Sequence, residues 1–215
     1  MPKADVKKEL KHLYQPSAKE VSEVDVPEMG FLMVDGQGDP NTSQEYQEAI
    51  EALYTVAYQL KFMIKGRDPE LDFVVPPLEG LWWVEDMAEF TTEDKDAWQW
   101  TAMIYQPDHV TRELFEEAVQ QVREKKDPAA LPLLRLERYH EGLAVQILYS
   151  GPFADEGPTI EKLHAFAREQ GYKLRGKHHE VYLSDPRRTA PEKLKTVIRQ
   201  PVERGLGSFE RQSSR

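Results

Sequence analysis

The residues of this sequence best suited to chemistry lie in the stretch Lys177–Pro186, which reads KHHEVYLSDP. The pattern predicts a strand that ends in a turn. Side chains alternate along a strand, so we expect His178, Glu180 and Tyr182 on one face. Glutamate is depleted in strands and is seldom buried without a partner or a function. If this face lines a pocket, Glu180 is its charged group: a cation anchor, a hydrogen-bond acceptor or a general base.

The four tryptophans provide a second feature, a candidate wall of aromatic rings. Trp82 and Trp83 are adjacent, so in a strand they point to opposite faces, and one of them is free to line a ligand site. Trp98 and Trp100 share a face. Aromatic rings stack on flat ligands and attract cations over their faces. Core packing is the simpler interpretation, and we expect it for two of the four. Weaker candidates for the wall are Tyr105, Tyr149, Phe153 and Tyr182.

Other candidate chemistry is limited. His178 and Glu180 can supply two metal ligands from one face, but no third ligand occurs at a diagnostic spacing, so we expect no metal and no cofactor. Glu79 occupies a place in the first half of the chain similar to that of Glu180 in the second half. Either the two carboxylates meet at the site, or Glu79 is a turn residue beside Gly80. A serine nucleophile has no support, because no Gly-x-Ser-x-Gly motif is present.

Composition limits the class of protein. The chain has 215 residues, no cysteine and a formal net charge of −10. Without cysteine there are no disulfides and no thiolate chemistry, which fits a cytoplasmic protein. An acidic surface repels phosphate backbones, so we expect no direct nucleic-acid partner. No window approaches the roughly 18 apolar residues of a membrane span, and the first residues lack a signal peptide's apolar segment, so we expect no membrane association.

One order of elements occurs twice, which predicts an α+β fold made of two fused, pseudo-symmetric βαββ units. Unit one spans about residues 22–106 and unit two about residues 132–202, and a helix at 111–125 joins them. We expect their antiparallel strands to form a cradle, with the helices outside. The domain boundaries expected from this are an N-terminal extension at 1–19 that is poorly ordered or loosely docked, the two-unit domain at 20–203 and a flexible tail at 204–215.

Local signals predict where the elements begin and end. Thr42 is the expected N-cap of the unit-one helix, and Gly66 is expected to stop it. Glu141-Gly142 reads as a hairpin between two short strands of unit two. The strands expected in unit one are 22–26, 30–36, 71–75, 80–84 and 98–105, and those expected in unit two are 133–139, 143–150, 177–183 and 194–202.

With these features in place, the sequence resembles the GyrI-like small-molecule-binding family. The resemblance covers roughly residues 20–203 and depends on the order of short motifs along the duplicated framework. Those motifs are Pro27–Gly30, Pro77–Trp83, His179–Pro186, Lys193–Thr196 and Pro201–Val202.

The resemblance implies two units related by a pseudo-twofold axis, with a ligand cleft between them and a glutamate of the second unit in that cleft. Glu180 matches this glutamate. The family includes multidrug-sensing domains fused to DNA-binding helices, a small gyrase-modulating protein, and stand-alone proteins that hydrolyse cyclopropane-bearing alkylating compounds. We see no helix-turn-helix here, and the Trp82-Trp83 pair is similar to that of the stand-alone group.

We therefore expect binding of flat, lipophilic, often cationic aromatic molecules. We also expect hydrolysis of strained cyclopropane-bearing compounds, with Glu180 as general base and Tyr182 orienting the water or donating to the developing anion. The sequence leaves open a non-catalytic drug-sensing or sequestering protein, and a gyrase-modulating protein. From the strand pattern alone, Glu180 also fits a solvated position paired with Lys177. A monomer and a homodimer are both compatible with these features.

Overall fold

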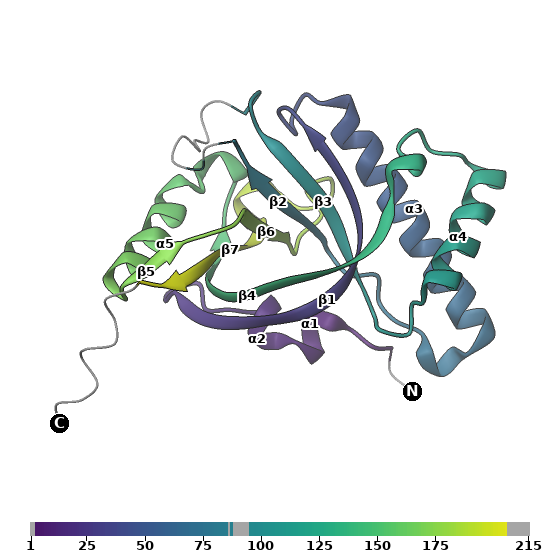
Figure 1. Ribbon diagram of the computed structural model, residues 1–215, viewed down its shortest axis with the longest axis horizontal. Coiled ribbons are helices and arrows are strands. Elements are labelled where there is room, and N and C mark those ends of the chain that lie inside the picture. Colours follow the sequence, from purple (N-terminus) through teal and green to yellow (C-terminus); the bar gives the residue numbers. More distant parts are fainter. Residues whose placement is uncertain (1–2, 86, 88–94, 206–215) are drawn as a thin grey trace.

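The computed structural model describes residues 3–85, 87 and 95–205, so most of the tail predicted at 204–215 lies outside the described residues. The described part folds into an antiparallel sheet that closes on itself, with helices on the outside (Figure 1). Its strands are β1 (Ser22–Gln37), β2 (Leu78–Trp83), β3 (Gln99–Gln106), β4 (Arg135–Ser150), β5 (Tyr172–Leu174), β6 (His178–Tyr182) and β7 (Lys195–Arg204).

The sheet is a closed barrel in the described part of the chain. Its strand order is β4-β1-β3-β2-β6-β7, and β7 pairs back onto β4. The short strand β5 adds to β7 from outside this ring. The ring is not paired on both sides along its whole length: β1 before Gly30 and β4 before Ala144 each have one neighbouring strand.

The pairing pattern confirms the predicted α+β fold of two βαββ units. Unit one is β1-α3-β2-β3 and unit two is β4-α5-β6-β7, with β5 inserted after its helix. In each unit the last strand lies between the other two. The units then join through equivalent strands, β2 with β6 and β1 with β4. Because equivalent strands pair at both junctions, the two units are related by a pseudo-twofold axis.

The prediction of two short strands at the start of each unit is wrong, because β1 and β4 are continuous strands of 16 residues each. Pro27 is accommodated because β3 pairs with β1 only from Gly30 onward, so β1 has one neighbour at that point. Gly142, expected in a hairpin, instead bends β4 with a φ of 70°. Bending at a glycine turns the strand around the barrel corner.

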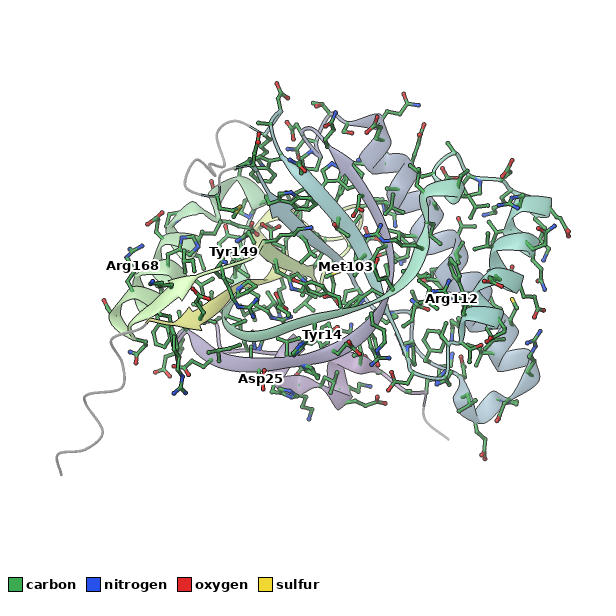
Figure 2. All side chains as sticks on the ribbon, in the orientation of Figure 1. Tyr14, Asp25, Met103, Arg112, Tyr149 and Arg168 are labelled. Carbon is green, nitrogen blue, oxygen red and sulfur yellow. The ribbon has the colours of Figure 1, made fainter. Side chains whose placement is uncertain are left out.

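Side chains alternate between the inside and the outside of the barrel. An inner cluster contains Phe31, Met33, Leu81, Met103 and Val181, and two outer clusters lie under the helices. In Figure 2, Met103 and Tyr14 of the inner cluster lie in the middle of the molecule, whereas Arg112 and Arg168 lie toward its two sides.

The long helices of the described residues lie outside the barrel: α3 (Gln44–Arg67) and α5 (Gly157–Glu169) pack against the sheet, and α4 (Arg112–Lys125) packs against α3. α3 and α4 lie beside each other on the unit-one side, and α5 lies on the unit-two side (Figure 1). The cap of α3 is Ser43, not Thr42, and the helix continues through Gly66. The strand expected at 71–75 is replaced by a 3-10 turn at Pro69–Leu71 and an isolated bridge at Phe73. No described helix has the length and apolar character needed to cross a bilayer.

The N-terminal segment is packed onto the barrel, so the expectation of loose docking is wrong. Two short helices, α1 (Val6–Glu9) and α2 (Lys11–Tyr14), place Leu13 and Tyr14 in the inner cluster, where they are 0% and 2% exposed. The Tyr14 hydroxyl donates a hydrogen bond of 2.8 Å to Glu79 Oε1. Burial of these two side chains and a hydrogen bond to a carboxylate both stabilise this contact.

Candidate functional site

Glu180 lies where the two units meet, in β6 between β2 and β7. As the alternation predicts, His178 and Tyr182 share its face. His178 Nε2 lies 3.0 Å from Glu180 Oε1, and the Tyr182 hydroxyl donates a 2.7 Å hydrogen bond to Glu180 Oε2. Glu180 is 8% exposed, so a solvated position paired with Lys177 does not describe it.

The surroundings keep Glu180 ionised. Burial acts to raise the pKa of its carboxyl group, but the hydrogen bond and charge of His178, the hydrogen bond from Tyr182 and the charge of Lys95 outweigh it, so the pKa is lowered. The same contact acts in the other direction on Tyr182, whose pKa is raised well above its ordinary value by burial and by the Glu180 charge. Tyr182 is therefore a hydrogen-bond donor to a carboxylate.

Aromatic side chains of unit one enclose this polar group. Trp82 Nε1 donates a 3.0 Å hydrogen bond to the Tyr182 hydroxyl. The Tyr46 ring, from α3, lies 5.6 Å from Trp82 and 5.0 Å from Trp100 between centroids. From unit two, the Phe153 ring packs edge-on against Tyr182 at 5.6 Å. These contacts are typical of aromatic pairs in cores.

A glycine makes room for the Trp82 ring beside Glu180. The strand register pairs Gly80 with Glu180. A Cβ atom at Gly80 would lie 2.8 to 2.9 Å from atoms of the Trp82 indole, so only glycine allows the ring to lie over this backbone. The β2 sequence Leu-Glu-Gly-Leu-Trp-Trp thus places an indole next to the carboxylate of the neighbouring strand.

Glu156 is a second buried carboxyl group at the site, and the sequence analysis missed it. It caps the N-terminus of α5, yet its side chain makes no capping hydrogen bond, and it is only 4% exposed. Burial and the negative charge of Glu180 raise the pKa of Glu156 to about 9. Within the described residues, Glu156 Oε1 and Thr196 Oγ1 have no hydrogen-bond partner. We call His178, Glu180, Tyr182, Tyr46, Trp82, Trp100, Phe153, Glu156 and Thr196 the Glu180 cluster.

Three predicted site residues lie elsewhere, on the inner face of the barrel. Glu79 pairs in register with Val181, not with Glu180, and its carboxylate points to the opposite side of the sheet. The two carboxylates therefore do not meet, because a shift of one residue along a strand moves a side chain to the other face. Trp83 lies under the Lys177 ammonium group, 3.3 Å from its ring centroid. Tyr105 packs edge-on against Phe31 at 6.0 Å.

The remaining aromatic candidates lie beside the Glu180 cluster. Trp98 packs against Trp82 with ring centroids 5.4 Å apart and is 4% exposed. The Tyr149 hydroxyl donates a 2.9 Å hydrogen bond to the Pro152 carbonyl oxygen, and burial, followed by the negative charge of Glu156, raises the pKa of Tyr149. Trp98 and Tyr149 therefore pack beside the Glu180 cluster and are not members of it.

A separate charged group fills the inside of the barrel, which we call the inner network: Tyr14, Glu79, Glu141, Gln146, His179 and Arg199. The two ring nitrogens of His179 donate to Glu141 at 2.9 Å and to Glu79 at 3.0 Å. Arg199 donates to Glu141 at 3.1 Å and to the Leu13 carbonyl oxygen at 2.8 Å. Two cations thus balance two carboxylates, and the network binds α2 to the barrel.

The pKa values inside the barrel agree with this pairing. The two carboxylates raise the pKa of His179 to about 9 despite its burial, so its ring is protonated and both nitrogens donate. Burial alone would raise the pKa of Glu141, but His179 and Arg199 lower it to about 2. Every polar group here has a partner, so the inner network is best explained as structural.

Two surface cavities lie away from these groups. One of about 410 Å³ is lined by residues that include Ile64, Leu71 and His109. Another of about 430 Å³ lies against Tyr58 and Phe62 of α3. Neither contains a member of the Glu180 cluster. Among the residues described, no three histidine or carboxylate side chains are placed to hold a metal ion.

Comparisons with known proteins identify the family to which the chain belongs. The profile of the GyrI-like small-molecule-binding domain matches residues 19–203, and the chain belongs to this family. An uncharacterized conserved protein from Listeria innocua is 45% identical, with a TM-score of 0.87 over 94% of this chain and 100% of that one. A hydrolase from the same organism is 42% identical, with a TM-score of 0.81 and the same coverage.

A more distant structure shares the fold alone. The C-terminal domain of EcmrR is 11% identical and superposes with a TM-score of 0.53 over 86% of this chain and 98% of that domain. No curated protein matches the chain.

Proposed function

We propose that the protein binds flat, lipophilic, often cationic aromatic compounds at the Glu180 cluster and hydrolyses those that carry a strained cyclopropane ring. The observation that carries this proposal is the buried Glu180 carboxylate, hydrogen-bonded by Tyr182 and enclosed by aromatic rings from both units. Its family supports small-molecule binding, and the description of a 42% identical relative as a hydrolase supports catalysis. In this proposal the protein acts directly on the small molecule in the cytoplasm, without nucleic acid.

The proposed reaction uses Glu180 as the base. Glu180 accepts a proton from a water molecule, and the water oxygen forms a bond to a carbon of the strained ring. The ring bond to that carbon breaks, and its electron pair moves to the part of the substrate that can accept it, such as a conjugated carbonyl. That part of the substrate takes up a proton and Glu180 releases the one it received, so the net change is the addition of one water. Tyr182 donates a hydrogen bond that holds Glu180 or the water in place. General base catalysis of this kind contributes about 10²–10⁴-fold in rate.

A lowered pKa makes Glu180 ready to accept a proton at neutral pH but also makes it a weak base. Ring strain and fixed geometry must supply the rest of the rate enhancement. The cluster is also filled by its own side chains, since Trp82 is 2% exposed. A ligand of aromatic size therefore enters only when rings such as the half-buried Phe153 move aside.

The proposal is tested with a compound in which a cyclopropane is conjugated to a carbonyl group. The purified protein is incubated with it, and the products are followed by mass spectrometry. We expect a product heavier by one water that forms in proportion to protein concentration. The same compound without protein is the control, and equal rates in the two reactions contradict the hydrolase proposal.

One observation favours a second candidate function, binding without turnover. A carboxylate of lowered pKa serves well as a permanent negative charge for a cationic ligand. In that case Glu180→Gln weakens binding of a cationic dye and spares a neutral dye of the same shape, and the wild-type protein forms no hydrolysis product. Turnover by the wild-type protein rejects this second candidate.

A further inference from the structure

The Glu180 cluster contains two carboxyl groups that come from different elements of unit two. Glu180 lies in the middle of β6, and Glu156 ends the turn before α5. Thr196 of β7 pairs in register with Tyr182 and interacts with Glu156. The side chains of Glu180 and Thr196 are both close enough to interact with the Glu156 carboxyl group.

The position of Glu156 indicates a role other than capping. A polar side chain at the N-cap usually accepts hydrogen bonds from the first turn of its helix. Glu156 makes no such bond, and its side chain is buried instead. Buried polar atoms nearly always have partners. Glu156 Oε1 and Thr196 Oγ1 make no well-formed hydrogen bond with the described residues, although the two side chains interact with each other, so both atoms retain capacity to bond a ligand or a water.

When two buried carboxyl groups share a site, the charge of one raises the pKa of the other, so they are not both ionised at neutral pH. The charged and titratable groups that act on or respond to Glu156 are Glu180, Tyr182, Lys95 and Tyr149. Lys95 favours both anions, and the α5 N-terminus favours negative charge nearby. Burial and the Glu180 charge outweigh them at Glu156, so Glu180 has lost its proton and Glu156 retains one.

We propose that Glu156 is the proton donor that works opposite Glu180, so that the two carboxyl groups exchange a single proton during turnover. This inference rests on the hydrolysis proposed above. Water gives one proton to Glu180 as its oxygen bonds to the ring carbon. The ring bond breaks, and the atom that receives its electron pair takes the proton of Glu156. The proton then passes from Glu180 to Glu156, which restores the site, and the net change is the addition of one water.

The substrate class follows from this arrangement. A carboxylic acid beside a carboxylate gives the site one negative charge, so it accepts neutral or singly cationic compounds. The atom that receives the electron pair of the broken ring bond must be one that takes up a proton, as the oxygen of a conjugated carbonyl group does. Neutral strained rings conjugated to a carbonyl group meet both requirements.

Glu156→Gln is the test, because glutamine keeps the shape of the side chain and cannot transfer its proton. Asp155→Asn is the matched control, since Asp155 is the exposed neighbour in the same turn. Glu156→Asp keeps a carboxylic acid but moves it away from the site by the length of one methylene group. This variant replaces Glu156→Gln if Glu156→Gln does not fold. We measure kcat and KM for the carbonyl-conjugated cyclopropane across pH, the Kd of a neutral dye, and the infrared band of a neutral carboxylic acid at pH 7.

We expect Glu156→Gln to lower kcat by about 10²-fold or more with KM and the dye Kd within about twofold. The wild-type rate should fall at alkaline pH, where Glu156 loses its proton, and this fall should be absent in the glutamine variant. Glu156→Asp should lose part of kcat and keep the alkaline fall. The carboxylic acid band should be present in the wild type and in Asp155→Asn and absent in Glu156→Gln.

Two outcomes overturn the inference by itself: a wild-type protein without the acid band, or a glutamine variant that turns over at the wild-type rate. If the wild-type protein forms no product but shows the band, the proposed hydrolysis fails and the donor role fails with it. The band then shows that the carboxyl pair still shares a proton, so the two failures are distinguishable.

Discussion

Replacing His179 with glutamine should destabilise the protein strongly, because His179 is the cation between two carboxylates inside the barrel. It lies 3.0 Å from Glu79 and 2.9 Å from Glu141 and is 1% exposed. Without it, Glu79 has no cation within the inner network, and Glu141 has only Arg199. Removing one partner of a buried ion pair costs about 3–5 kcal/mol, because an uncompensated buried charge remains.

The pKa values give a similar magnitude. The pKa of His179 rises from 6.5 to about 9. At about 1.4 kcal/mol for each step of one in pKa, this corresponds to about 3 kcal/mol. The pKa of Glu141, lowered from 4.5 to about 2, describes largely the same ion pair, so the two contributions are not added.

The pH dependence provides the check. A raised pKa in the folded state means that the stabilisation is complete below pH 6.5 and is lost as the pH rises through about 9. Urea unfolding followed by tryptophan fluorescence at pH 6 and pH 10 should therefore show a large difference between wild type and His179→Gln at pH 6 and a small one at pH 10. His140→Gln, on the exposed surface of β4, should differ from wild type by less than about 0.5 kcal/mol.

Two results would refute this reasoning. One is a loss below about 1 kcal/mol at pH 6, which would mean that the inner network contributes little. The other is a difference that stays the same at pH 6 and pH 10, which would mean that the imidazolium charge is not what stabilises the barrel.

Three further predictions concern single side chains. Gly80→Ala should displace the Trp82 ring and weaken dye binding, because the new Cβ would lie 2.8 to 2.9 Å from atoms of the indole. Gly66→Ala has no neighbour within 4 Å and should stabilise the protein by up to about 1 kcal/mol in urea unfolding, since alanine favours the helical backbone of α3. Trp82→Phe should reduce the quenching of tryptophan fluorescence by a planar cationic dye, while Trp83→Phe should leave the dye Kd unchanged; equal effects would contradict their placement on opposite faces. Tyr14→Phe removes a donor to a buried carboxylate and should cost about 1.5–3 kcal/mol by urea unfolding, and a loss below about 0.5 kcal/mol would contradict it.

Local patterns predicted the parts of this fold that depend on neighbours in sequence. Strand alternation placed Glu180 and Tyr182 on one face because the pleat of a strand is a local property. The apolar spacing of α3 and α5 predicted both helices for the same reason. The equivalence of Glu79 and Glu180 failed because it depended on the register between β2 and β6, which only the packed sheet determines.

The features that sequence did not reveal depend on tertiary structure. Pro27 and Gly142 are residue types that usually interrupt strands. In the barrel, Pro27 lies where β1 has one neighbouring strand, and Gly142 lies at a bend of the continuous strand β4. Leu13 and Tyr14 lie in a charged segment whose sequence gives no sign of burial. Their burial depends on the inner cluster and on the hydrogen bond from Tyr14 to Glu79, which only the folded barrel provides. Glu156 resembles an acidic residue at the start of a helix, and an acid directly before Gly157-Pro158 is the only local signal for it.

The central claim is that Glu180 is the functional carboxylate of the site. The most direct test is the single-turnover rate of hydrolysis of a carbonyl-conjugated cyclopropane by Glu180→Gln, measured beside the wild type and beside Glu23→Gln, an exposed strand glutamate. We predict a fall of about 10²-fold or more for Glu180→Gln, with a neutral dye still bound, and no change for Glu23→Gln. An unchanged rate in Glu180→Gln, together with unchanged binding of cationic and neutral dyes, would contradict the claim.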